Sequence, residues 1–352
     1  MPVTLRLNNY YSLIKSRTLK RNLTFLFAVI LIVTRAYSQN EKGGYVPEGK
    51  AFAVIYTNFH KGIAGEALND DAFELQRAYL GYEYNFSPDF YAKINIDIGS
   101  PEDLSPYAKI RRYAYFKNAF LRYNKNRFEA EFGLINMRQF KLQEEIWERR
   151  YLMKTLADEN KLGTSADLGF NVNYKIGSFL NADFTMMNGE GYNSLQMDDV
   201  FKYSLGATIG KTDGFISRLS YDFTINEMTE STFLFFMSYF HKQRWNLASE
   251  FIYRKNEGWR ADNNIVGYSI YGKFNLAPKY QLFARFDKIG SNILEGEINP
   301  WHLSKDGTAL VAGVQFSPVG KIKMALNYHD WYPWAANRKE LSYIYLNIEV
   351  KM

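Results

Sequence analysis

The sequence predicts an all-β protein, a transmembrane antiparallel up-and-down β-barrel of about 16 strands with short periplasmic turns and longer outward loops. Three observations carry this prediction. Segments of roughly ten residues with alternating apolar and polar side chains recur along the chain, short and long connections alternate between them, and no run of 18 apolar residues could form a membrane helix.

The first segment, residues 1–38, is expected to be a cleaved signal peptide. Lys20 and Arg21 precede an apolar run from Leu23 to Val33, and the run Ala36-Tyr37-Ser38 places small residues where a signal peptidase reads the chain. The apolar run is shorter than the about 20 residues that a membrane helix needs, so an uncleaved anchor is the weaker interpretation. Residues 39–352 then form a single barrel domain.

The signal peptide also accounts for the basic character of the chain. All six of its charged residues are basic, so removing them from the 43 Lys and Arg leaves 37, against 37 Asp and Glu. The mature chain has no excess of positive charge, and nothing therefore points to a nucleic-acid partner.

The stretch FYAKINIDIG, residues 90–99, shows the alternation that predicts each strand. Ala92, Ile94 and Ile96 share one face, and Lys93 and Asp97 share the other, because successive side chains of a strand point in opposite directions. The same pattern predicts strands at 51–59, 73–86, 90–98, 113–124, 128–138, 166–176, 179–187, 201–210, 215–224, 231–240, 245–254, 264–276, 279–288, 308–317, 321–330 and 340–350.

The connections distinguish a membrane barrel from a soluble sandwich. Tight links at 87–89, 125–127, 177–178, 211–214, 241–244, 277–278 and 318–320 alternate with longer ones at 60–72, 100–112, 139–165, 188–200, 225–230, 255–263, 289–307 and 331–339. Both ends of a sandwich face water alike, whereas a barrel in an outer membrane has tight periplasmic turns and long outward loops. The last strand is expected to pair with the first, since an open edge in lipid leaves backbone groups unpaired.

Aromatic residues are expected to form a girdle beside the short turns. We assign to it Tyr84, Phe86, Phe90, Tyr123, Tyr221, Phe223, Tyr239, Phe240, Trp245 and Tyr280.

The third outward loop, residues 139–165, is the longest connection. Its stretch EEIWERRYLMKTLADEN is expected to form a short helix with Ile146, Met153 and Leu156 on one side. A loop of this length can fold into the barrel and narrow the pore, or lie on the surface as a helix. In the first case the constriction residues would be Glu144, Glu145, Arg149 and Arg150.

Strand parity also predicts which charged side chains face the lumen. The acidic ones are Glu83, Asp97, Glu129, Glu131, Asp167, Asp183, Asp222, Glu250 and Asp287. The basic ones, as candidate pore-lining residues, are Arg77, Lys93, Arg122, Lys175, Lys202, Arg218, Arg254, Lys273, Arg285 and Lys323. The two sets nearly balance, so each residue has an alternative interpretation as part of a structural ion pair across neighbouring strands.

Three segments make the chain resemble the phosphate-selective porin O and P type of outer-membrane channel. They are FELQRAYLGYEYNFSPDFYAKINIDIG (73–99), AFLRYNKNRFEAEFGLINMRQF (119–140) and MNGEGYN (187–193). The resemblance implies a 16-stranded barrel, a homotrimer, an inward-folded third loop and phosphate as a solute.

The sequence therefore favours a porin, a passive diffusion channel for small hydrophilic solutes, with anions such as phosphate among the candidates, in the outer membrane of a Gram-negative-type cell. The expected partners are outer-membrane lipid and these solutes. A second hypothesis is a non-conducting barrel that serves as a surface binding scaffold, in which Trp301, Trp331, Tyr332 and Trp334 would contact carbohydrate or protein.

An outer-membrane hydrolase is the third and weakest hypothesis. No nucleophile elbow or phosphate loop occurs, and His329 and Asp330 are strand neighbours that face opposite ways. The chain has no cysteine, and its four histidines do not pair at ligand spacing, so we expect no enzyme activity, no metal and no cofactor.

Overall fold

The computed structural model describes residues 45–99, 113–242 and 244–352. The predicted signal peptide, residues 1–38, and the predicted connection at 100–112 lie outside them. The compact unit considered below runs from Pro47 to Met352.

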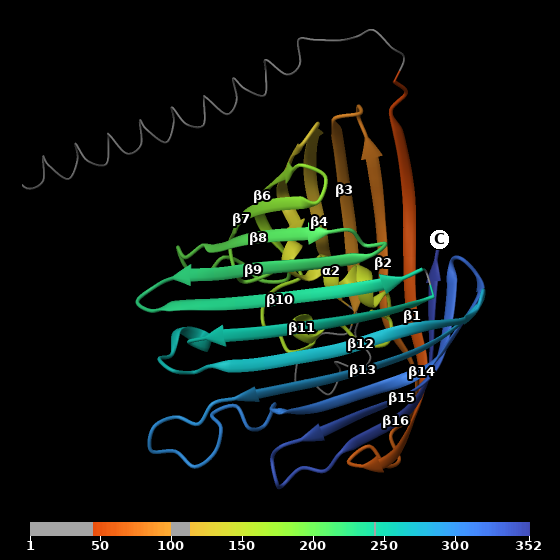
Figure 1. The fold of residues 1–352 in the computed structure, drawn as a ribbon, viewed down its shortest axis with the longest axis vertical. Coiled ribbons are helices and arrows are strands. Elements are labelled where there is room, and N and C mark those ends of the chain that lie inside the picture. Colours follow the sequence, from red (N-terminus) through yellow and green to blue (C-terminus); the bar gives the residue numbers. More distant parts are fainter. Residues whose placement is uncertain (1–44, 100–112, 243) are drawn as a thin grey trace, which may run out of the picture. The chain divides into compact units, whose positions relative to one another are not determined.

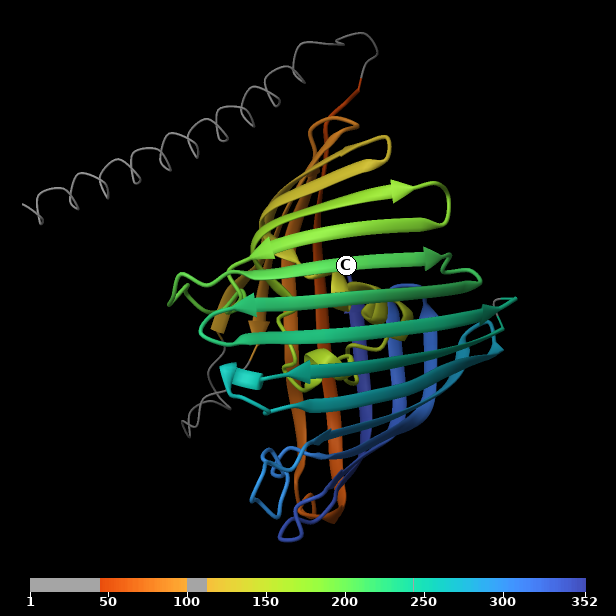
Figure 2. The same ribbon diagram turned by 60° about the vertical axis from the view of Figure 1, so that its left-hand side comes forward.

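The described chain forms a closed antiparallel barrel of 16 strands, which confirms the predicted fold class. Figure 1 and Figure 2 show the strands following one another around a wall that encloses helix α2. The strands are β1 Glu48–Gly65, β2 Asp71–Asn85, β3 Phe90–Gly99, β4 Tyr113–Lys125, β5 Phe128–Asn136, β6 Ala166–Ile176, β7 Leu180–Met187, β8 Lys202–Gly210, β9 Phe215–Ile225, β10 Thr229–His241, β11 Trp245–Lys255, β12 Ile265–Ala277, β13 Tyr280–Ser291, β14 Gly307–Val319, β15 Ile322–Pro333 and β16 Leu341–Lys351.

The barrel closes where the first strand meets the last. β1 pairs with β16 from Val54 opposite Lys351 to Gly65 opposite Leu341. The predicted first strand, 51–59, was too short at both ends, because its extra residues pair with β2 down to Glu48 opposite Asn85. Backbone pairing extends a strand whatever its side-chain pattern, and sequence alternation alone does not reveal it.

The two faces of the wall differ as the alternation predicts. In β9 the side chains of Ile216, Arg218 and Asp222 are buried, whereas Leu219 and Ile225 are exposed. The buried face is the inner one, since Ile216 belongs to the core cluster that contains Trp147 of α2. Apart from Ser217, the outer face of β9 carries aliphatic and aromatic side chains, as a lipid-facing surface requires.

Two helices interrupt the connection between β5 and β6. Helix α2 covers Arg138–Trp147 and helix α3 covers Leu156–Glu159, and a backbone hydrogen bond of 3.0 Å from Met137 to Ser165 closes the base of the connection. Helix α2 buries Gln139, Phe140, Gln143 and Trp147 on one face, the spacing of an amphipathic helix. A 3-10 turn, η1 Glu257–Trp259, lies between β11 and β12.

The single helix predicted within 144–160 was wrong. Helix α2 begins earlier and ends before Glu148, which has a left-handed φ of 57°, and residues 149–155 are not helical. Arg149 bonds to Gln281 of β13 and Tyr151 to Gln315 of β14, which are paired neighbours, whereas residues two apart in a helix point to nearly opposite sides. Met153 and Leu156 are nevertheless buried, as a core-facing position requires.

The predicted aromatic girdle also needs a correction. Tyr221 and Phe223 lie near the end of β9 at Ile225, the opposite end from the predicted tight turn at 211–214. The connection that follows was predicted to be one of the longer ones, at 225–230, but it comprises only residues 226–228. Phe223 stacks there on Tyr203 at a ring-centroid distance of 5.4 Å. Aromatic residues therefore lie near both ends of the strands.

None of the helices in the described part of the chain is both long and apolar enough to cross a membrane.

Candidate functional site

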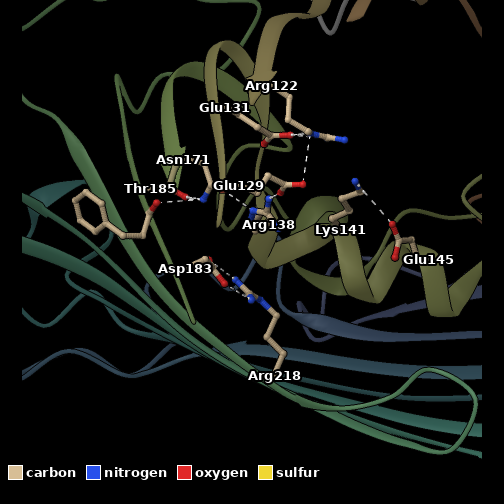
Figure 3. Close-up of polar contacts among 11 residues, drawn as sticks. Arg122, Glu129, Glu131, Arg138, Lys141, Glu145, Asn171, Asp183, Thr185 and Arg218 are labelled. Carbon is tan, nitrogen blue, oxygen red and sulfur yellow. Dashed lines mark hydrogen bonds and ion pairs between the residues drawn. The ribbon is translucent and has the colours of Figure 1, made fainter. Parts of the chain in front are cut away.

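The inner wall from β4 to β9 carries a chain of charged and amide side chains (Figure 3). Arg122 of β4 donates from Nε to Glu131 of β5 at 2.8 Å and forms an ion pair with Glu129 at 3.7 Å. Arg138 of α2 contacts the same Glu129 and donates to Asn171 of β6 at 2.6 Å. The first turn of α2 is thereby tied to the wall by a charge-assisted contact.

A second, drier pair continues this wall. Arg218 of β9 donates to both carboxylate oxygens of Asp183 on β7, at 2.7 and 3.0 Å, and to Thr208 of β8 at 2.9 Å. Both charged side chains are almost fully buried. The fork reaches across β8 because Gly206 stands between the two strands; a Cβ there would lie 2.3 Å from Arg218 Nη2.

Ten basic residues were predicted to line the lumen, and nine of them, all but the exposed Lys175, have an acidic partner. The pairs are Arg77–Asp97, Lys93–Glu83, Arg122–Glu131, Lys202–Asp222, Arg218–Asp183, Arg254–Glu230, Lys273–Glu148, Arg285–Asp287 and Lys323–Glu349. Most of these pairs join neighbouring strands, so each positive charge is neutralised by a nearby carboxylate. This is the arrangement expected from the structural alternative for these residues.

The segment from Arg138 to Leu162, called here the inner segment, crosses the interior of the barrel. Near its start Arg138 bonds to β5 and β6, and near its middle Glu148 accepts a hydrogen bond of 2.6 Å from Lys273 of β12. Asn347 of β16 donates to the carbonyl oxygen of Tyr151 at 3.3 Å. Strands on opposite sides of a closed ring can contact one segment only from within the ring.

The four predicted constriction residues do not converge on one point. Arg149 is buried against the wall, where its guanidinium lies 4.8 Å from the Phe283 ring and donates to Gln281 at 2.7 Å. Glu145 is largely exposed on the free face of α2, with Lys141 at 3.9 Å. These two residues therefore belong to opposite sides of the inner segment.

Arg150 holds the folded shape of the inner segment. It donates to Glu144 of α2 and to Asp158 of α3, and its Nε lies 3.5 Å from the hydroxyl of Tyr79 on β2. Burial by itself raises the pKa of Asp158, but the attraction of Arg150 outweighs it and lowers that pKa to about 2. Asp158 is therefore ionised at neutral pH and joins the two helices through Arg150.

Sequence reasoning missed one buried cation of this interior, Lys117. Lys117 is buried beneath the rings of Tyr79 and Tyr192. It is the extra residue of a bulge, since Asn118 and Phe116 pair with the consecutive residues Asn95 and Ile96. Parity cannot predict its direction because a bulge changes the alternation locally.

A cavity of about 1030 Å³ lies at the end of the barrel where the longer connections are. Its lining includes Arg77 and Asp97 of β2 and β3, Arg150 and Asp158 of the inner segment, and Trp259 of η1. We call this cavity the vestibule. The inner segment forms its floor.

The described residues show no cluster of three or more possible metal ligands. Among these residues Asp330 accepts hydrogen bonds from Tyr328 at 2.6 Å and Ser342 at 2.9 Å, and no hydrogen bond joins it to His329.

Several solved outer-membrane proteins are similar to this chain in fold. The outer membrane channel DcaP of Acinetobacter baumannii has a TM-score of 0.65 at 11% identity, with 89% of this chain and 99% of that chain covered. OmpF of Salmonella typhi, solved in complex with daunomycin, has a TM-score of 0.62 at 9% identity, covering 86% and 97%. OmpT, an outer membrane protein of Vibrio cholerae, has a TM-score of 0.60 at 10% identity, covering 88% and 99%.

No protein-family model matches the sequence, and no curated protein matches it. The likeness to solved structures thus establishes a porin-type outer-membrane barrel fold. The phosphate-selective O and P subtype rests on the sequence motifs alone.

Proposed function

We propose that the protein is a passive diffusion channel for small hydrophilic solutes in the outer membrane of a Gram-negative-type cell. The observation that carries the proposal is the closed 16-stranded wall, which is apolar outside and ionised inside. A barrel of this strand number is wide enough to hold an aqueous passage.

Water is expected along the wall that faces the free side of α2. The side chains of Lys93 and Arg122 are 21% and 24% exposed, and that of Glu83 is 34% exposed. Ionised groups keep partial hydration where the surroundings are wet, since burying a charge completely is costly. We assign the passage to the space between this wall and the exposed Lys141 and Glu145 of α2.

In this proposal the inner segment sets the width of the passage. Arg149 and Arg150 act as anchors that fix the segment, and Glu144 is held by Arg150. Glu145 is the residue of the predicted constriction set that contacts passing solute. A mixed Lys141–Glu145 edge opposite paired wall charges would discriminate by size more than by charge.

Anions such as phosphate remain the finer proposal for the solute. Arginine forks suit phosphate oxygens, but an arginine that already holds a carboxylate must exchange one anion for another. We therefore expect weak anion preference at most.

Single-channel recording tests the proposal. The chain without residues 1–38 would be inserted into a planar bilayer, and the reversal potential measured under a salt gradient. Stepwise conductance with a reversal potential near zero is the expected result. Glu145→Gln should shift the reversal potential in the direction of anion selectivity. Glu340→Gln should leave the reversal potential unchanged, because Glu340 lies outside the lumen set.

A second candidate, the non-conducting scaffold, is favoured by one observation. Trp147, Tyr151 and Leu156 of the inner segment are almost fully buried in a common cluster with wall residues, as in a plug. A folded protein that inserts into bilayers without conducting would decide for this candidate and against the channel.

The assembly and the export route are further proposals. We infer a homotrimer from the sequence resemblance, supported by an OmpT structure that is described as a trimer form. Chemical cross-linking in detergent tests it. Cleavage after Ser38 is tested by N-terminal sequencing of the protein from outer membranes.

A further inference from the structure

The vestibule has aromatic side chains on opposite walls. Tyr113 and Tyr115 of β4 stack at a centroid distance of 6.3 Å and an interplanar angle of 22°. Trp259 lies between β11 and β12, on the far side of the closed ring from β4. All three line the same cavity.

Trp259 is held in place at a conformational cost. Its φ is 56°, in the left-handed region that a bulky side chain rarely adopts, and its indole nitrogen donates to Thr224 at 3.1 Å. The side chain is still 38% exposed, so this geometry does not serve to bury it. Strain of this kind is often found at ligand-binding positions.

The charged groups of the vestibule cancel. Equal numbers of basic and acidic side chains line it. Arg77 lies 3.4 Å from Asp97, and Arg254 donates to Glu230 at 2.7 Å. The lining therefore carries no net formal charge, and its Arg and carboxylate pairs present donors and acceptors side by side.

The side chains that remain accessible include both kinds of group. Arg77 is 24% exposed and can donate, and Glu257 is 30% exposed and can accept. A solute with hydroxyl groups can use both at once, because each hydroxyl both donates and accepts. A phosphate held by Arg77 or Arg254 would have to displace the carboxylate that is already paired with that arginine.

We propose that the vestibule binds neutral carbohydrate. The π faces of Trp259 and the Tyr113–Tyr115 pair would pack against the C–H faces of sugar rings, which carry partial positive charge. The volume lies at the upper end of the roughly 300–1,000 Å³ of ligand sites, which leaves room for a short oligosaccharide. The inference rests on the proposed channel function and names the solute class that its entrance selects.

The test uses the neutral trisaccharide maltotriose as probe. Ion current through the wild-type channel would be recorded while maltotriose, and separately inorganic phosphate, is added to the side of the longer connections. We expect maltotriose to interrupt the current. Trp259→Ala should raise its apparent Kd about tenfold, the loss of one aromatic contact.

Trp334→Ala is the matched control, because Trp334 is 40% exposed in another long connection and does not line the vestibule. Its apparent Kd should stay at the wild-type value. Tyr115→Leu, on the opposite wall, should weaken binding as Trp259→Ala does, and heat-modifiable gel mobility would verify that each variant is folded.

The remaining outcomes separate this inference from the channel function. Conduction that maltotriose never interrupts, or that phosphate alone interrupts, would overturn the inference and leave the channel intact. Without conduction the channel proposal fails, and quenching of tryptophan fluorescence by maltotriose, lost in Trp259→Ala but kept in Trp334→Ala, would still support the site. Absence of such quenching would overturn it.

Discussion

At the scale of single residues, the interior is organised by local charge neutralisation. The Arg218–Asp183 pair shows the principle most sharply, because both groups are almost fully buried and bonded at two points. A buried ion pair contributes little compared with apolar packing, yet removing one member leaves an uncompensated charge. These pairs therefore contribute mainly by restricting which residues can occupy neighbouring positions on the inner wall.

Arg218→Met should lower the free energy of unfolding by ~3–5 kcal/mol, because Asp183 stays buried without its partner. The double variant Arg218→Met with Asp183→Leu should recover most of this loss. Denaturant unfolding in liposomes measures both. Lys61→Met, at the exposed pair with Asp71, should change stability by less than ~1 kcal/mol. Equal losses of unfolding free energy in Arg218→Met and Lys61→Met would contradict the distinction between buried and exposed pairs.

The Arg150–Asp158 contact predicts acid sensitivity. The pKa of Asp158 is lowered from 3.8 to about 2 in the folded protein, so its stabilisation is complete above the ordinary value and is lost as pH falls toward 2. At 1.36 kcal/mol per pH unit the loss is about 2 kcal/mol. The free energy of unfolding would be measured against pH for the wild type and for Asp158→Asn. The difference between the two curves isolates this contribution. Parallel curves between pH 4 and pH 2 would refute it.

At the scale of elements, strands and inner segment obey different rules. Each strand separates lipid-facing from inner side chains by its period of two, visible in β9. The inner segment breaks its helix at Glu148 to send Arg149 and Tyr151 to different strands. Its shape is therefore dictated by partners on the wall and not by helix propensity.

Leu156→Ala should destabilise the inner segment by ~2–5 kcal/mol, because this α3 side chain is almost fully buried and packs close to Gly267 of β12. We expect noisier conductance as the segment loosens. Leu195→Ala, in an exposed position of the β7–β8 connection, is the matched control and should have an effect within ~0.5 kcal/mol. Thermal unfolding in detergent gives the comparison.

At the scale of the whole molecule, closure and membrane insertion depend on each other. Pairing of β1 with β16 joins the two terminal strands of the described barrel, so none of its 16 strands is an edge strand. The outer surface can then be apolar over the full circumference. An open sheet with the same strands could not be accommodated in hydrocarbon.

This picture predicts a depth dependence for charge on the outer face. Leu219 lies near the middle of β9 and Ile225 at its end, and both are exposed on the same face. Leu219→Arg should cost ~2–4 kcal/mol in a bilayer, and Ile225→Arg only ~0–1 kcal/mol. Unfolding from liposomes measures both. Equal costs would mean that this face does not span the membrane.

Several features were predictable from sequence because they depend on local periodicity. The strand count follows from a pattern that lipid on one side and water on the other impose on every strand. The predicted alternation of short and long connections fails between β9 and β10, where only residues 226–228 separate the strands. The pairing of β1 with β16 was predictable from the cost of an open edge. That lumen residues such as Lys93 would have acidic partners was also predictable, because charges of opposite sign share the same inner face.

Other features could be decided only by the tertiary structure. Nothing in the pattern of β4 indicates that Lys117 occupies a bulge, because a bulge depends on the register of the neighbouring strand. The split of the predicted helix at Glu148 and the separation of Arg149 from Glu145 depend on wall residues more than a hundred positions away. Sequence alone thus determined a lipid-facing barrel with a charged interior, since both follow from contacts with solvent and lipid. The course of the inner segment and the two-walled vestibule arise from long-range contacts, which only barrel closure brings together.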